Sequence, residues 1–142
     1  MKKLSLFLIS VLLLSLSACS LQKNQKDFSA LREIFLERGN EIEGYEVTEI
    51  EEYDGFDYFC VRISLNADEN VAPQDYVWYD ADVMLFDSLE EADRAYEENQ
   101  QSGVGGVCIR HENILMYWLK ADPFADFYRE VFDLAFYKDS EN

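Results

Sequence analysis

The chain has few basic residues, and this shortage limits the partners that it can bind. Only 12 Lys and Arg stand against 29 Asp and Glu, which gives a net charge of −17 at pH 7. Nucleic acid binding requires cations that replace the counterions of phosphates, so we expect no nucleic acid partner. The same balance argues against a domain that lies flat on an anionic lipid surface. A partner with a basic surface is allowed, although net charge bears first on solubility.

Histidine is almost absent, and the cysteines form no Cys-x-x-Cys motif. His111 is the single histidine, and it lies beside a predicted turn at residues 112–113 without a recognisable nucleophile motif nearby. A zinc site would need more histidines or free thiols. Residues 66–70 begin like a calcium loop, but Val71 stands where glycine is needed and Val77 where a bidentate glutamate is needed. We therefore expect no metal, no other cofactor and no catalytic residue.

Long apolar runs are also scarce, and the clearest one lies at the start of the chain. Residues 4–16 are predominantly apolar and follow Lys2 and Lys3. The run is short for a membrane span, which needs about 20 apolar residues. A basic start, an apolar stretch and small residues after it are typical of a secretory signal peptide. We predict that residues 1–18 are this signal.

The four residues Leu16-Ser17-Ala18-Cys19 resemble the lipobox of bacterial lipoproteins. The resemblance implies that the thiol of Cys19 is diacylglycerylated and that the peptide is cut before it. The protein would then be extracytoplasmic and held at the cell membrane by lipid. By the same resemblance, Ser20 in place of aspartate favours the outer membrane in a two-membrane cell. Cleavage removes two lysines and no acid, so the net charge changes from −17 to −19.

The mature chain has a length suited to one domain. We predict an irregular tether over residues 19–26 and a single α+β domain over residues 27–142, similar to the heads of many small lipoproteins. Apolar spacing predicts helices over residues 28–38, 89–102 and 123–135, with Ser88 and Asp122 as the N-terminal caps of the second and the third. Alternating patterns predict strands over residues 45–53, 58–65, 76–86, 104–111 and 114–119. The order α-β-β-β-α-β-β-α, with short links, predicts an antiparallel sheet of about five strands with helices on at least one face.

Two cysteines remain if Cys19 is lipidated. Cys60 and Cys108 fall in predicted strands, on the face opposite the aliphatic one. Cysteines in an exported domain often pair, so we predict a disulfide if their strands are neighbours. The alternative is two half-buried thiols that act as small apolar residues.

One face of the predicted second and third strands mixes aromatic and charged side chains. Its members are Tyr58, Arg62, Tyr76, Trp78, Asp80 and Asp82. Tyr and Trp are common interface anchors, so this face is our candidate for contact with a peptide, a sugar or a basic protein loop. The alternative is that the last helix covers the face and makes Tyr76 and Trp78 core residues.

The sequence therefore favours a non-catalytic, lipid-anchored binding or interaction module of the bacterial envelope. A second hypothesis is an inhibitor or immunity-type protein whose acidic surface neutralises a basic partner. A third is a small hydrolase that uses the carboxylates of Asp80 and Asp82, which lie about 7 Å apart on one strand face. Such an enzyme would need a carboxyl with a raised pKa in a cleft.

Overall fold

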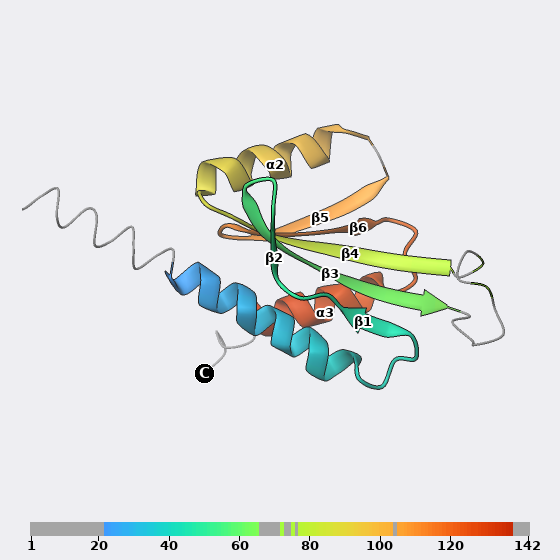
Figure 1. The fold of residues 1–142 in the computed structure, drawn as a ribbon. Helices are drawn as coiled ribbons and strands as arrows, with labels where there is room; N and C mark the ends of the chain where they lie inside the picture. The colour runs from blue at the N-terminus through green and yellow to red at the C-terminus, as the bar shows by residue number, and fades with distance from the viewer. Residues whose placement is uncertain (1–21, 66–71, 73–74, 76, 104, 138–142) are drawn as a thin grey trace, which may run out of the picture.

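The computed structural model describes residues 22–65, 72, 75, 77–103 and 105–137. The protein is an α+β domain with an antiparallel sheet, as predicted (Figure 1). The strands are β1 (Tyr45–Val47), β2 (Glu51–Tyr53), β3 (Phe56–Leu65), β4 (Val77–Phe86), β5 (Gly106–His111) and β6 (Ile114–Leu119). The helices are an N-terminal helix that includes residues 22–39, α2 (Leu89–Gln101) and α3 (Ala125–Phe136). The sheet order is β1-β3-β4-β6-β5, and β2 also pairs with β3.

The N-terminal helix includes residues that were predicted to be a tether. Residues 22–26 are helical, so the predicted tether over residues 19–26 is wrong for this part. The helix packs here through polar contacts: Lys23 Nζ lies 3.2 Å from a carboxylate oxygen of Glu112, and Gln25 donates to Asp57 at 2.6 Å. Polar side chains that contact turns give no apolar periodicity, which is why the pattern predicted only the later turns of this helix.

The predicted first strand is divided into two short strands at residues 48–50. The backbone N–H of Thr48 donates to Cys60 of β3, but its carbonyl accepts from Arg32 Nε at 2.9 Å. The N–H of Cys60 donates instead to the side-chain hydroxyl oxygen of Thr48, at 2.8 Å. The buried Arg32 of the N-terminal helix therefore interrupts the strand, and the sheet has six strands instead of about five.

The two later helices begin differently. The Ser88 hydroxyl accepts the N–H of Glu91 at 3.2 Å, which confirms the predicted cap of α2. Asp122 accepts the N–H of Phe124 at 2.8 Å, but regular α-helix starts only at Ala125. The predicted Asp122 cap therefore stabilises a turn that precedes α3, and the predicted start of this helix is two residues early.

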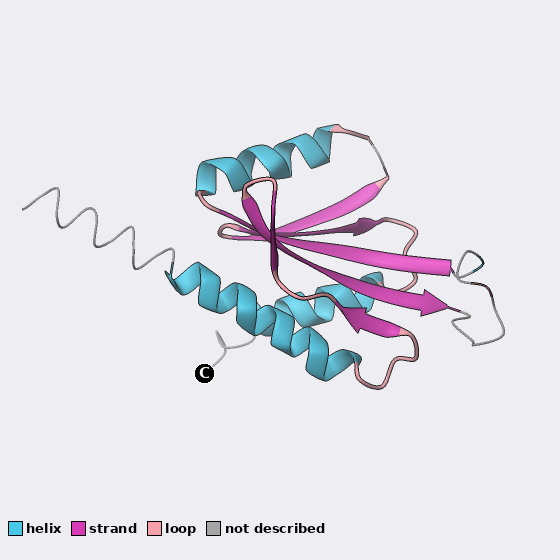
Figure 2. Ribbon diagram, viewed as in Figure 1, coloured by secondary structure: helices cyan, strands magenta, loops and turns pink. Residues whose placement is uncertain are grey.

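Helices cover the two faces of the sheet unequally (Figure 2). The N-terminal helix and α3 pack on one face and form the main core with strand residues such as Phe59, Val83 and Trp118. On the opposite face α2 forms a smaller core around Ala92, Cys108 and Leu115, over β5, β6 and part of β4. Within the described ranges, no helix has both the length and the apolar character required to cross a membrane.

Candidate functional site

The half of the sheet that α2 leaves uncovered is the candidate site. Cross-strand pairing places side chains from β1, β2, β3 and β4 on this side of the sheet. We call this surface the open face; its charged and aromatic members are Glu46, Glu51, Tyr53, Phe56, Tyr58, Arg62, Trp78, Asp80 and Asp82. Its four carboxylates outnumber its one guanidinium group, so its local charge is negative.

At one end of the open face, the guanidinium group of Arg62 contacts both the carboxylate of Asp80 and the ring of Trp78. Its Nε and Nη2 atoms donate to the two carboxylate oxygens of Asp80, each at 2.7 Å. Its guanidinium carbon lies 4.8 Å from the centre of the Trp78 ring. Bidentate and stacked contacts orient a guanidinium group strongly. The result is an ordered platform in which Trp78 remains 44% exposed.

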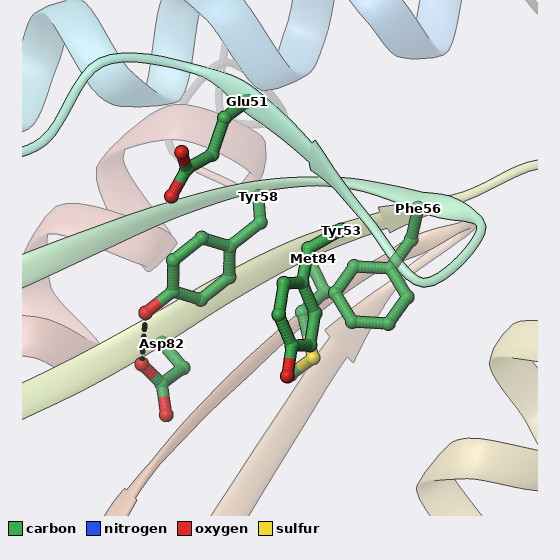
Figure 3. Close-up of a pocket in the computed structure, with 6 residues that line it drawn as sticks. All are labelled: Glu51, Tyr53, Phe56, Tyr58, Asp82 and Met84. Carbon is green, nitrogen blue, oxygen red and sulfur yellow. Dashed lines mark hydrogen bonds between the residues drawn. The ribbon is translucent and has the colours of Figure 1, made fainter.

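At the other end, six side chains line a cavity with a volume of about 440 Å³ (Figure 3). We call it the aromatic pocket; it is lined by Glu51, Tyr53, Phe56, Tyr58, Asp82 and Met84. The Tyr53 ring centre lies 5.8 Å from that of Phe56 and 6.2 Å from that of Tyr58. The Tyr58 hydroxyl donates to Asp82 at 2.8 Å. Burial and the adjacent Asp82 carboxylate raise the pKa of Tyr58, so it stays a donor at neutral pH.

A tight turn brings the first strand residues to this pocket. Asp54 and Gly55 both have positive φ angles, 49° and 89°, as in the hairpin turns that match strand twist. This turn sets Tyr53 opposite Phe56 and Glu51 opposite Tyr58. Glu51, Tyr53, Phe56 and Met84 were not predicted from the sequence as site residues. An Asp-Gly pair between two strand patterns is a hairpin signal, and a register extended by three pairs from this turn reaches Tyr53 and Glu51.

The structure confirms the predicted placement of five candidate residues on one face: Tyr58, Arg62, Trp78, Asp80 and Asp82. Cys19 and Tyr76 lie outside the described residues, as do residues 66–70 of the incomplete calcium pattern. The last helix does not cover this face, because α3 buries Tyr128, Val131 and Phe132 against the opposite one. The alternative in which that helix makes Trp78 a core residue is therefore wrong.

The predicted disulfide between Cys60 and Cys108 is wrong. Both cysteines are buried free thiols on the same side of the sheet. Their strands β3 and β5 are separated by β4 and β6, so three strand spacings of roughly 4.8 Å lie between them. A disulfide needs Cα atoms within about 7 Å. Burial, with Asp80 and Asp82 nearby, raises the pKa of Cys60 to about 12, and burial raises that of Cys108 to about 11.

The side chains considered for catalysis, those of Asp80, Asp82 and His111, each contact a different partner. Asp80 binds Arg62 and Asp82 accepts from Tyr58, so each carboxylate has its own partner. His111 stacks on Phe136, with ring centres 4.2 Å apart. Among the residues that the structure describes, no three His, Cys, Asp or Glu side chains are grouped to hold a metal ion.

One buried carboxyl, that of Asp122, belongs to the turn before α3. Asp122 precedes α3, accepts the N–H of Phe124 and is 3.4 Å from the Tyr128 hydroxyl, which donates to it. Burial raises the pKa of Asp122, its two hydrogen bonds oppose the rise, and the negative charge of Asp80 adds to it. Its hydrogen-bond partners are Phe124 in the turn before α3 and Tyr128 of α3, and not a side chain of the open face.

Comparison with protein-family models, curated proteins and solved structures gave no match.

Proposed function

We propose that the chain is a lipid-anchored, extracytoplasmic binding module of the bacterial envelope that captures a polypeptide partner with a basic surface. The observation that carries the proposal is the open face, half of one side of a sheet with aromatic rings and an excess of carboxylates. Aromatic anchors with a charged surround are typical of protein interfaces. An acidic surface also accelerates association with a basic partner.

The contacts of the N-terminal helix support an orientation for the anchored domain. Lys23 binds Glu112 and Gln25 binds Asp57, so the first turns of this helix lie beside the β5–β6 and β2–β3 turns. Cys19 lies only three residues before residue 22. A lipid on Cys19 would hold this end of the domain at the membrane, with the aromatic pocket near the anchor and Trp78 farther along the strands.

Crosslinking in intact bacteria tests the proposal. The full chain is expressed and crosslinked, and captured proteins are identified by mass spectrometry. We expect a reproducible partner that is reduced in a Cys19→Ala chain and lost in a Trp78→Ala chain. Tyr137→Ala is the matched control, because Tyr137 is 50% exposed but follows α3, away from the open face. The proposal would be contradicted if Trp78→Ala and Tyr137→Ala reduced partner capture equally, or if capture were unchanged in the Trp78→Ala chain.

Salt distinguishes this module from an inhibitor that works by charge alone. Screening shortens the reach of exposed charges to about 8 Å at 0.15 M ionic strength and about 3 Å at 1 M. Capture through Trp78 should persist at high salt, because aromatic burial is not screened. Capture by the acidic surface alone should disappear, and that result would favour the inhibitor hypothesis.

A further inference from the structure

The aromatic pocket has the wall chemistry that organic cations prefer. Three aromatic rings, from Tyr53, Phe56 and Tyr58, and the thioether of Met84 provide polarizable surface. Aromatic faces attract cations because their π-systems are negative at the face. Glu51 and Asp82 add two carboxylates, and none of the described residues in the lining is a Lys, Arg or His. The cavity volume of about 440 Å³ lies within the range of ligand pockets.

The charge of this pocket is not neutralised from within the described part of the chain. No ion pair among the described residues includes Glu51 or Asp82. The guanidinium group on the same face belongs to Arg62, which is held by both oxygens of Asp80. Within the described residues, the neutral hydroxyl of Tyr58 is the one hydrogen-bond donor to Asp82, so the negative charge of this carboxylate remains available to a ligand.

We propose that the aromatic pocket binds an organic ammonium or guanidinium group, borne by a lysine or arginine side chain of the polypeptide partner. This inference rests on the proposed function and names the group that the partner must present. The geometry favours a polypeptide source because the pocket and the Trp78 platform share one face. Tyr58 and Arg62 are four residues apart on β3, about 13 Å at strand rise, so an extended segment of similar length spans both.

Methionine methyl groups provide a direct readout. The chain has three methionines, and Met1 precedes the predicted cleavage site. Met84 lines the pocket, whereas Met116 is fully buried in the main core. The full chain, with ¹³C-labelled methionine methyls and in detergent micelles, is titrated with n-butylammonium and with 1-butanol as a neutral analogue. A second titration uses the capped peptide Ala-Ala-Lys-Ala-Ala and its norleucine counterpart. We expect the two charged probes to shift the Met84 signal saturably and to leave Met116 unchanged.

Single substitutions test the residues that carry the proposal. Glu51→Gln and Asp82→Asn should each weaken binding about 3-fold, the effect of one charge at close range in a wet site. Tyr53→Ala should weaken it about 2- to 5-fold through loss of a cation–π contact, and Tyr53→Phe should restore it. Glu52→Gln is the matched control, because it removes the same charge from the neighbouring position on the other side of β2. The Met116 signal reports whether each variant is folded.

The outcomes separate this inference from the proposed function. Absence of a saturable Met84 shift, equal binding of neutral and charged probes, or equal weakening by Glu52→Gln would overturn the pocket assignment. Binding of n-butylammonium without binding of the lysine peptide would overturn the polypeptide source. If partner capture is lost in the Trp78→Ala chain but unchanged in the Glu51→Gln and Asp82→Asn chains, this inference is overturned and the proposed function is retained.

A second cavity gives an internal control for charge. It has a volume of about 290 Å³, and its lining includes Arg110 and Arg129 beside Tyr96 and Tyr137. Like the aromatic pocket it is lined by aromatic rings, but it carries two guanidinium groups beside one carboxylate, that of Asp133. The cationic probe should change the ring signals of Tyr96 and Tyr137 less than the methyl signal of Met84. Equal changes would show that the probe binds exposed aromatic surface in general, and they would overturn the assignment of the aromatic pocket as the cation site.

Discussion

The two tryptophans of the chain offer the sharpest test of which sheet face is core. Trp118 on β6 is 0% exposed and packs on Tyr128, with ring centres 5.8 Å apart. Trp78 on the neighbouring strand β4 lies on the opposite face and is 44% exposed. We predict that Trp118→Ala strongly destabilises the domain and that Trp78→Ala has a much smaller effect, although the two substitutions are chemically identical.

The magnitudes follow from burial. Removing a fully buried tryptophan loses its transfer free energy and leaves a cavity, which costs about 3–5 kcal/mol. A tryptophan buries roughly 250 Å² at most, so the partly exposed Trp78 buries roughly half of that, and alanine keeps part of it. At about 25 cal/mol per Å² the loss is about 1–2 kcal/mol, without a cavity term because solvent reaches the site. The two variants should therefore differ by about 1–4 kcal/mol.

Urea unfolding of both variants, followed by far-UV circular dichroism, measures this difference. With a slope of about 2 kcal/mol per molar, Trp118→Ala should lower the midpoint by about 2 M and Trp78→Ala by about 0.5–1 M. If Trp118→Ala does not fold, Trp118→Phe should still lower the midpoint more than Trp78→Phe. Equal losses, or a larger loss for Trp78, would refute the assignment of the open face and with it the proposed site.

Two further predictions concern buried titratable groups. In a Cys19→Ala chain purified without reductant and then denatured, two thiols should react with a chromogenic disulfide reagent. In the folded protein neither thiol should react quickly, because burial raises the pKa of Cys60 and of Cys108. If no thiol reacts in denaturant, the two cysteines form a disulfide. For Asp122, burial raises the folded pKa, so the folded state keeps a proton that the unfolded chain releases above about pH 3.9. Stability relative to an Asp122→Asn variant should therefore fall as the pH rises from about 4, and a difference in urea midpoints that is flat or rises with pH would contradict this.

Local sequence patterns predicted most of the fold because strand pleating and helical spacing are local properties. The alternation along β3 predicted that Phe59, Val61, Ile63 and Leu65 share one face; the first three are fully buried, whereas Leu65 at the end of the strand is 37% exposed. The break in the first strand could not be predicted in this way. It depends on Arg32, which comes from a separate helix and takes the carbonyl of Thr48.

The same local alternation of side chains along a strand predicted part of the candidate site. Alternation placed Arg62 and Asp80 on one face, but only the register showed that they lie directly opposite each other. The aromatic pocket needed a further step, since Tyr53 reaches it through the pairing that the Asp54-Gly55 turn imposes. A residue on a separate strand contributes to a site only if the register brings it there.

The sequence by itself determined which side chains point to each side of a strand, where the main turns fall and how strongly acidic the molecule is. Only the tertiary structure decided that β3 and β5 are separated by two strands, so that Cys60 and Cys108 cannot meet. It also decided that α2 covers β5 and β6 whereas α3 packs on the opposite face, which leaves Trp78 and the aromatic pocket open. The physical reason is that pleating repeats every two residues along the chain, whereas strand order and helix placement depend on how distant apolar surfaces are buried together.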